Sequence, residues 1–504
     1  MHTIRRVVAI HLRLAGPAAA PLYQRVDRGV RDAIEAGTLK PGDRLPSVAE
    51  LAKDLKVARL TVLKAFQALE REGLLSTEVG RGTFVAGGAR RGPAAAAPEA
   101  RPNVSRALRA LREGYARGLQ EMMRVARPPG TIELGGGVPS VDSVPDGTLE
   151  RLTRDALAHD PRRLYAYPGP AGLPELRDAV ARTLARDGLA VSADEVVATN
   201  GTQQAVALIA AWAREHDRPV LCETPTYAGI PGAFMLMGHT VTSVPWTADG
   251  LDLAALRAAP GARPLLYVCP DFHNPTGATM SAPARRALAA WAREADATVV
   301  EDRIFRDLRF EGTAPPPLYG LLAPGRRFLV GSVSKSFMTG LRVGFLVADR
   351  PVVDDLLPYK RSMDLGGPSL VQAVAATFLD HGYVEHLDRL RPRYRARRDA
   401  AVAALEAALP AGARFTRPEG GFQLWVTLPD GLSAIEVFLR GVERGVAVSP
   451  GPAYDVDGRY TSSFRVGFGH LPEPDVAEGI RRLGDAIRSL AGRASAVTAA
   501  GNPV

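Results

Sequence analysis

Apolar residues recur at a helical spacing near the N-terminus of the chain. Leu22, Val26, Val30 and Ile34 follow one another at intervals of four, which places them on one face of a helix. The pattern predicts this helix over residues 22–37.

A second and a third helix and a hairpin are predicted downstream. Ser47, with Glu50 three residues later, forms a capping box that predicts a helix over 48–55. After a three-residue turn, apolar positions at helical spacing predict another helix over 59–72. Short apolar segments on either side of Gly80-Arg81-Gly82 are expected to pair as a hairpin. Two short helices, a tight turn and a hairpin are typical of a winged helix-turn-helix.

The remainder of the chain has a different pattern, in which short Val- and Leu-rich strands alternate with longer amphipathic helices. This alternation predicts an α/β domain with a mostly parallel sheet. A stretch rich in Gly, Pro and Ala, too poor in large apolar residues to bury a core, precedes it. We therefore expect a first domain at 1–86, a linker at 87–118, a second domain at 119–492 and a flexible tail at 493–504.

Charge and composition narrow the class of protein. The net charge of the 504-residue chain is +9, and residues 1–92 hold 16 Lys and Arg against nine Asp and Glu, which suggests a polyanionic partner for the first domain. Only Cys222 and Cys269 are present, so a disulfide framework is not expected. No apolar run approaches the roughly 20 residues that span a bilayer, and we expect a soluble, cytoplasmic protein without a membrane partner.

Four short motifs in the first domain resemble the GntR family of winged-helix regulators. They are Pro21-Leu22-Tyr23, the segments 41–47 and 59–62, and Gly80–Val85. The resemblance implies binding to a double-stranded DNA operator, and it places at the DNA the residues Arg44, Ser47, Arg59, Thr61 and Arg81. Ala58 is a departure, because the family usually has a serine there that caps the recognition helix.

Three segments of the second domain carry residues suited to pyridoxal phosphate, whose chemistry needs a lysine amine, an acid at the pyridine nitrogen and a phosphate-binding turn. Lys335 follows the strand 328–330, and Asp302 ends a buried strand at the edge where ligands bind in such sheets. Asn200–Ala205 joins a strand to a helix whose free backbone N–H groups suit a phosphate. Taken singly, Lys335 could be a surface charge and Asp302 a structural acid.

Together with the segment 271–277, these segments resemble the fold-type-I aminotransferases over about 370 residues and in the same order. The resemblance implies pyridoxal 5′-phosphate as cofactor, with a Schiff base on Lys335. It also implies that Asp302 pairs with the pyridinium, that Asn274 donates to the cofactor's O3′, and that Tyr227 stacks on the ring. The implied phosphate ligands are Gly201, Thr202, Gln203, Ser332, Arg342 and Tyr167 of the partner subunit.

Arg465 lies in a segment that resembles the carboxylate-binding segment of the same family, and a guanidinium can bind a carboxylate through two hydrogen bonds. Gly136 and Gly137 resemble the loop that lets the backbone approach the same ligand. Phe305 departs from the family, which commonly has a tyrosine two or three residues after the pyridinium acid. Efficient transamination is therefore in doubt, whereas cofactor binding is not.

The combination of both domains resembles the MocR/GabR-type regulators. It implies a homodimeric transcription regulator that senses pyridoxal phosphate or a small amino compound through external aldimine formation, with RNA polymerase as a further candidate partner. Two alternatives stay open: a working aminotransferase that carries a DNA-binding appendage, and a DNA-binding protein whose second domain serves only for dimerisation.

Overall fold

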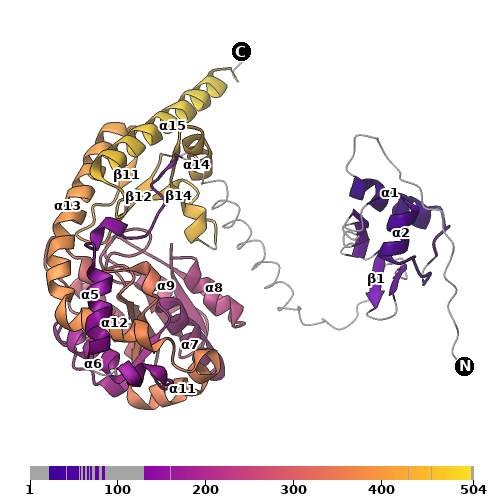
Figure 1. The fold of residues 1–504 in the computed structure, drawn as a ribbon. Helices are drawn as coiled ribbons and strands as arrows, with labels where there is room; N and C mark the ends of the chain where they lie inside the picture. The colour runs from indigo at the N-terminus through magenta and orange to yellow at the C-terminus, as the bar shows by residue number, and fades with distance from the viewer. Residues whose placement is uncertain are drawn as a thin grey trace, which may run out of the picture. The chain divides into compact units, whose positions relative to one another are not determined.

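The computed structural model of the chain divides into two units, Met1–Pro102 and Asn103–Val504 (Figure 1). The described residues are 22–40, 42–55, 57, 61–62, 65–66, 69–70, 74–78, 82–85, 130–158, 161–429, 431–455 and 457–500. The boundary between the units falls within the predicted linker at 87–118, all of which lies outside the described residues.

The N-terminal unit has the predicted winged helix-turn-helix elements. Ser47 caps helix α2: its Oγ accepts from the backbone N–H of Glu50 at 3.3 Å, while the Glu50 carboxylate accepts from the N–H of Ser47 at 2.8 Å. Helical residues at 61–62, 65–66 and 69–70 fall within the predicted third helix. The elements are α1 (Leu22–Glu35), α2 (Val48–Asp54), β1 (Leu75–Glu78) and β2 (Gly82–Val85).

The core of this unit is formed by the inner helix faces and the hairpin. Val30, Leu51, Val62, Leu69 and Val85 are buried in one cluster. The hairpin strands β1 and β2 are antiparallel. On the predicted face of α1, Val26 and Val30 are buried and Ile34 packs against the cluster, whereas Leu22 is 46% exposed; the predicted hairpin is confirmed.

A loop before α2 is tied to the hairpin. The backbone N–H of Gly42 donates to the carbonyl of Val85 at 2.8 Å, and that of Leu45 to the carbonyl of Thr83 at 2.9 Å. Arg44 forms an isolated antiparallel bridge with Phe84. Arg44, which the sequence places at the DNA, is thus held against the wing.

The larger unit is built on a seven-stranded sheet with the order β4-β10-β9-β8-β7-β5-β6. Strand β10 is antiparallel to both its neighbours, and the remaining pairs are parallel. The mostly parallel α/β sheet predicted from the alternation is confirmed. The strands are β4 (Val196–Thr199), β5 (Val220–Thr224), β6 (Val241–Pro245), β7 (Leu265–Val268), β8 (Thr298–Asp302), β9 (Arg327–Ser332) and β10 (Gly344–Ala348).

Helices cover both faces of this sheet, because its strands are apolar on both sides. Residues of α7, α8 and α11 pack with the sheet in one core cluster, those of α9 and α10 in a second, and those of α5, α6 and α12 in a third. These helices are α5 (Thr148–Ala158), α6 (Pro174–Ala185), α7 (Thr202–Glu215), α8 (Gly229–Leu236), α9 (Leu253–Ala258), α10 (Ala282–Glu294), α11 (Arg350–Asp364) and α12 (Ser369–His381).

A smaller antiparallel sheet, with the order β11-β12-β15-β14, completes the unit beside the helices α13 to α15, and β13 pairs with β3 (Figure 1). Its position brings β14 and β15 to the functional site. The elements are β3 (Ile132–Glu133), α13 (Tyr383–Ala408), β11 (Arg414–Phe415), β12 (Gln423–Thr427), α14 (Ala434–Glu443), β13 (Val446–Ala447), β14 (Ser449–Pro450), β15 (Ser463–Gly467) and α15 (Glu473–Ala500).

Helix α15 differs from the prediction at its end. It continues to Ala500, so most of the segment expected to be a flexible tail, 493–504, is helical. Four of the eight residues from 493 to 500 are alanine, a strong helix former that favours extension of the helix. Within the part of the chain that the structure describes, no helix is both long and apolar enough for a membrane span.

Candidate functional site

A cavity of about 700 Å³ collects the predicted site residues of the larger unit. Gly201 directly precedes the lining residue Thr202, while Tyr167 is 80% exposed and lies outside the cavity lining. The predicted residues that line it are Gly136, Gly137, Thr202, Gln203, Tyr227, Asn274, Asp302, Ser332, Lys335, Arg342 and Arg465.

Lys335 follows strand β9 and reaches into this cavity. Its Nζ donates to the carbonyl oxygen of Gly137 at 2.7 Å. Burial lowers the pKa of the Lys335 ammonium to about 8, and the nearby Arg465 and Arg342 guanidinium groups contribute to the decrease. At pH 7 roughly a tenth of the amine is therefore neutral, and hence nucleophilic, which is far more than at the ordinary pKa of 10.5.

Asp302 is buried at the carboxyl end of β8. Its carboxylate accepts a hydrogen bond from the Tyr267 hydroxyl and another from the backbone N–H of Ile304, the latter at 2.9 Å. Burial raises the pKa of Asp302 to about 6, although both hydrogen bonds oppose the increase. A cationic partner, such as a protonated ring nitrogen, would stabilise the ionised form of an acid in this environment.

The sequence analysis did not identify Tyr267. It lies on β7, adjacent and parallel to β8, opposite Val300. The one available signal was a hydroxyl-bearing residue in an otherwise aliphatic strand, Leu265–Val268.

A turn suited to an anion lies at the N-terminus of α7. Gly201 is the residue before the helix and has φ +76°, a conformation that favours glycine. A Cβ atom at this position would lie 2.5 Å from the Arg342 guanidinium, so Arg342 covers the turn. Among the described residues, the buried Oγ1 of Thr202 has no hydrogen-bond partner. Free backbone N–H groups, a guanidinium and an unpartnered hydroxyl together suit a phosphate.

Arg465 lines the cavity from strand β15. Its guanidinium donates to the Asn274 Oδ1 at 2.8 Å and to the Gly135 carbonyl at 2.5 Å, and it lies 5.1 Å from the centre of the Tyr454 ring. Gly137 lies close to this guanidinium, since a Cβ there would be 3.0 Å from an Arg465 nitrogen and the guanidinium would have to shift slightly. Because the side-chain oxygen of Asn274 accepts from Arg465, the amide N–H groups of Asn274 can donate to another acceptor.

The remaining predicted cofactor residues line the same cavity. Tyr227 is about half exposed, and a Cβ on Gly229 would lie 2.5 Å from its ring. The Gln203 amide donates to the Gly229 carbonyl at 2.9 Å, which fixes the segment beneath the ring. Ser332 donates to the carbonyl of Val343 at 2.7 Å.

Phe305 occupies the position where the family commonly has a tyrosine. It is buried and packs edge to face against Phe422, with ring centres 5.3 Å apart. The ring lines the cavity without offering a hydroxyl. His273 stacks on Trp246 with ring centres 4.3 Å apart and is absent from the cavity lining, consistent with a packing role.

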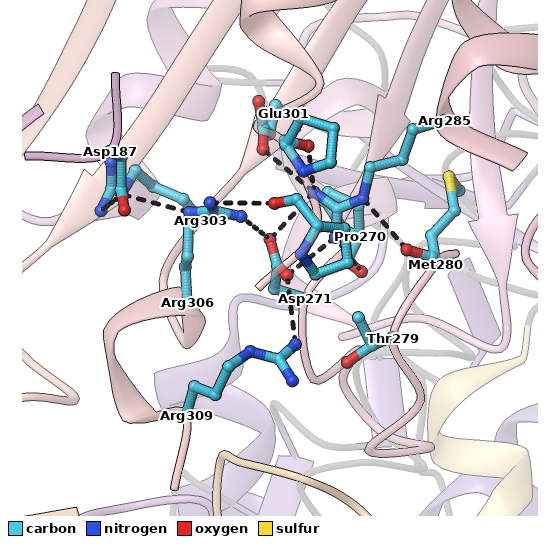
Figure 2. A network of polar contacts seen from close by, with 12 residues as sticks. Asp187, Pro270, Asp271, Thr279, Met280, Arg285, Glu301, Arg303, Arg306 and Arg309 are labelled. Carbon is cyan, nitrogen blue, oxygen red and sulfur yellow. Dashed lines mark hydrogen bonds and ion pairs between the residues drawn. The ribbon is translucent and has the colours of Figure 1, made fainter. Parts of the chain in front are cut away.

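A buried network of charges lies behind the site (Figure 2). Arg285, which is fully buried, donates to both oxygens of Asp271 at 2.7 and 3.2 Å, and Arg306 donates to Asp271 at 3.0 Å. Burial opposes ionisation of Asp271, yet the two guanidinium groups hold the pKa of Asp271 below its ordinary value. The Arg285 guanidinium also lies 4.0 Å from the Glu301 carboxylate. The network thereby joins the segment before Asn274 to the strand that ends at Asp302.

In the N-terminal unit the structure describes three of the five predicted DNA contacts. Arg44 and Thr61 are partly buried, and Ser47 is exposed with its hydroxyl engaged in the cap of α2. Arg59 and Arg81 lie outside the described residues.

Comparison with known families separates the chain into the same two parts. The family described as "Aminotransferase class I and II" matches residues 129–483. The family described as "Bacterial regulatory proteins, gntR family" matches residues 22–85.

Individual relatives fall into two kinds. The 2-aminoadipate transaminase of Thermus thermophilus is 35% identical over 74% of this chain and 94% of its own length. The HTH-type transcriptional regulator YisV of Bacillus subtilis is 31% identical over 93% of this chain and 96% of its own length. The solved structure of LysN, an α-aminoadipate aminotransferase from Thermus thermophilus, matches with a TM-score of 0.68 and 33% identity, covering 74% of this chain and 95% of that one. Of these three proteins, YisV alone matches this chain over both units.

We predict that Arg285→Met strongly destabilises the larger unit, by about 3–5 kcal/mol, because it leaves the buried Asp271 without its closest cation. Chemical denaturation followed by tryptophan fluorescence measures the change. Arg481→Met, which removes an exposed ion pair with Glu478 on α15, is the control and should leave the midpoint almost unchanged. An equally small shift for both variants would contradict a stabilising role of the network.

Proposed function

Since the chain belongs to the class I and II aminotransferases and joins that fold to a GntR-family domain, as the MocR/GabR-type regulators do, we propose that it is a pyridoxal-phosphate-dependent transcription regulator. The observation that carries the proposal is the convergence of Lys335, Asp302, Thr202 and Arg465 on one cavity in a chain with a DNA-binding domain. The regulator senses pyridoxal phosphate itself or an amino compound that reacts with it.

The residues of the cavity fit the cofactor. The turn at Gly201 and Thr202, with Arg342 and Ser332, is the proposed phosphate site, because it combines helix N–H groups with an unpartnered hydroxyl. Asp302 is proposed to keep the ring nitrogen protonated, and Asn274 to donate to O3′. When bound, the cofactor supplies an aldehyde that condenses with a primary amine and releases water.

Lys335 is proposed to hold the cofactor covalently, and its environment prepares the amine for this role. Burial and the two neighbouring guanidinium groups favour the neutral form of Lys335, which is the nucleophile. The Nζ of Lys335, through which the cofactor would be held, donates to the carbonyl of Gly137 in this structure and is thereby kept in the cavity.

The effector class follows from Arg465. This guanidinium faces the cavity, and a carboxylate could replace its hydrogen bonds to Asn274 and Gly135 with stronger charge-assisted ones. We therefore propose an effector that carries both an amine and a carboxylate. To regulate, it must bind two arrangements of the protein with different affinity.

A working aminotransferase is the second candidate, because each residue group required for cofactor binding is present. Phe305 favours the regulator over the working aminotransferase. It leaves the cofactor's O3′ without the hydroxyl that the family commonly supplies there, and Tyr267, the nearby hydroxyl described above, is engaged by Asp302.

A homodimer is part of the proposal. Tyr165 and Tyr167 are 82% and 80% exposed on the segment before α6, which is unusual for large aromatic side chains. Tyr167 of the partner subunit would complete the phosphate site. A symmetric dimer would also present two GntR-family domains to paired half-sites on a DNA operator.

Replacing Lys335 tests the proposal directly. Wild-type protein reconstituted with pyridoxal phosphate should show visible absorbance that survives gel filtration, and Lys335→Ala should lose it, since Lys335 is the one lysine among the described residues that line the cavity. A colourless wild type would refute the cofactor assignment. Rapid multiple-turnover transamination by the wild type would instead favour the enzyme.

The rate of cofactor attachment should depend on pH. Because the pKa of Lys335 is lowered to about 8 from an ordinary 10.5, the neutral amine, and hence the attachment rate, increases through pH 8 and levels off above it. Arg465→Met removes a nearby positive charge and should move the midpoint to higher pH. Stopped-flow absorbance measures both profiles, and a wild-type midpoint near 10 would contradict the lowered pKa.

The N-terminal unit should supply the contacts to DNA. Arg59→Ala, on the predicted recognition helix, should weaken operator binding about tenfold or more, as loss of a base contact does. Fluorescence anisotropy with promoter DNA measures the affinity. Visible absorbance of the same preparation is the control and should equal that of the wild type; unchanged DNA affinity would place the recognition surface elsewhere.

A further inference from the structure

A partly buried carboxylate outside the cavity contacts the phosphate turn and the loop that packs against the segment carrying Tyr167. Asp364 is the last residue of α11, and its partner Lys360, one helical turn earlier, is almost completely buried at 1% exposure. Their ion pair takes no part in the site described so far. A buried ion pair is a poor source of stability compared with apolar packing, so its presence calls for another role.

One oxygen of Asp364 binds the phosphate turn. Its Oδ2 accepts from the Asn200 side-chain amide at 2.6 Å and from the Gln204 amide at 2.9 Å. Gln204 in turn accepts from the backbone N–H of Asn200 at 2.8 Å. Asn200 directly precedes Gly201 and Thr202, so these contacts fix the backbone that starts α7.

The other oxygen binds the loop that follows α11. Oδ1 of Asp364 accepts from the Lys360 ammonium and, at 3.0 Å, from the backbone N–H of Gly366. The carbonyl of Gly366 accepts from the Gln372 amide at 2.7 Å, and Gln372 accepts from the backbone N–H of Leu173 at 2.8 Å. The chain of contacts therefore continues to the beginning of α6.

This loop lies directly against the segment with Tyr167. A Cβ on Gly366 would lie 2.0 Å from the carbonyl oxygen of Gly169, which only glycine avoids, and Ser369 donates to the carbonyl of Ala166 at 3.3 Å. Residues 166–173 are thus held at two points by the loop that Asp364 anchors.

We infer that Asp364 is a positioning residue that fixes the phosphate turn and the Tyr167 segment together, so that anion binding at the turn and association of two subunits are coupled. The inference rests on the proposed cofactor and dimer. Because coupling is reciprocal, pyridoxal phosphate should tighten the dimer by the same factor by which dimerisation tightens cofactor binding.

The test uses the full-length protein and two measurements: the dissociation constant of pyridoxal phosphate from visible absorbance, and that of the dimer from sedimentation with and without cofactor. Asp364→Asn should weaken cofactor binding about tenfold or more, because charged hydrogen bonds to the turn are lost. Cofactor should no longer tighten its dimer.

Two further variants separate positioning from folding. The double variant K360M/D364L removes the pair without leaving a buried charge, so it should fold and still show both losses. Asp349→Asn is the matched control. Asp349 precedes the first residue of α11, is 16% exposed against 15% for Asp364, and accepts from Arg327 and from the Gly325 backbone without touching the turn. It should behave like the wild type.

The inference would be overturned if the double variant bound the cofactor as tightly as the wild type and its dimer were still tightened by the cofactor. Failure of the proposed function looks different, since the wild type itself would then be colourless. In that case inorganic phosphate serves as the probe of the turn, and its binding is measured as an increase in the thermal unfolding midpoint. Stabilisation of the wild type and Asp349→Asn, with none for K360M/D364L, would still support positioning by Asp364, and equal shifts in all three would refute it.

Discussion

The ion pair between Arg285 and Asp271 is the contact on which the geometry of the site depends. Asp271 lies three residues before Asn274, and Arg285 approaches Glu301, the residue before Asp302. Through Asp271 and Glu301, one buried guanidinium therefore links the segment that carries Asn274 to the strand that ends at Asp302. Because the low polarity around this network makes an unpaired charge costly, its members cannot rearrange one at a time.

The same principle extends across the larger unit. Three charged side chains on different elements are each matched by a partner: Asp302 at the end of β8 by the Tyr267 hydroxyl, Asp364 at the end of α11 by Lys360, and Arg465 on β15 by Asn274. The arrangement keeps polar groups at fixed positions without solvent. It also explains why the pKa values of Lys335 and Asp302 move towards one another, since burial disfavours the charge of each.

Much of the site could be predicted from the sequence because its residues follow strands in recognisable motifs. Lys335, Asp302 and Asn274 each follow or end a strand, and the topology then brings them to one edge. Tyr267 and Asp364 were missed for a physical reason: their importance lies in partners 35 and about 160 residues away in the chain, and nothing local marks such contacts. The length of helix α15 was underestimated because its alanine-rich end has no capping signal.

The unpartnered hydroxyl of Thr202 has a consequence for the lifetime of the protein. A buried hydroxyl without a partner among the described residues costs free energy in the folded chain, and an anion that supplies the missing acceptor removes that cost. Binding then stabilises the fold by mass action. In a cell that degrades partly unfolded chains, the abundance of such a regulator, and not only its activity, would follow the supply of its cofactor.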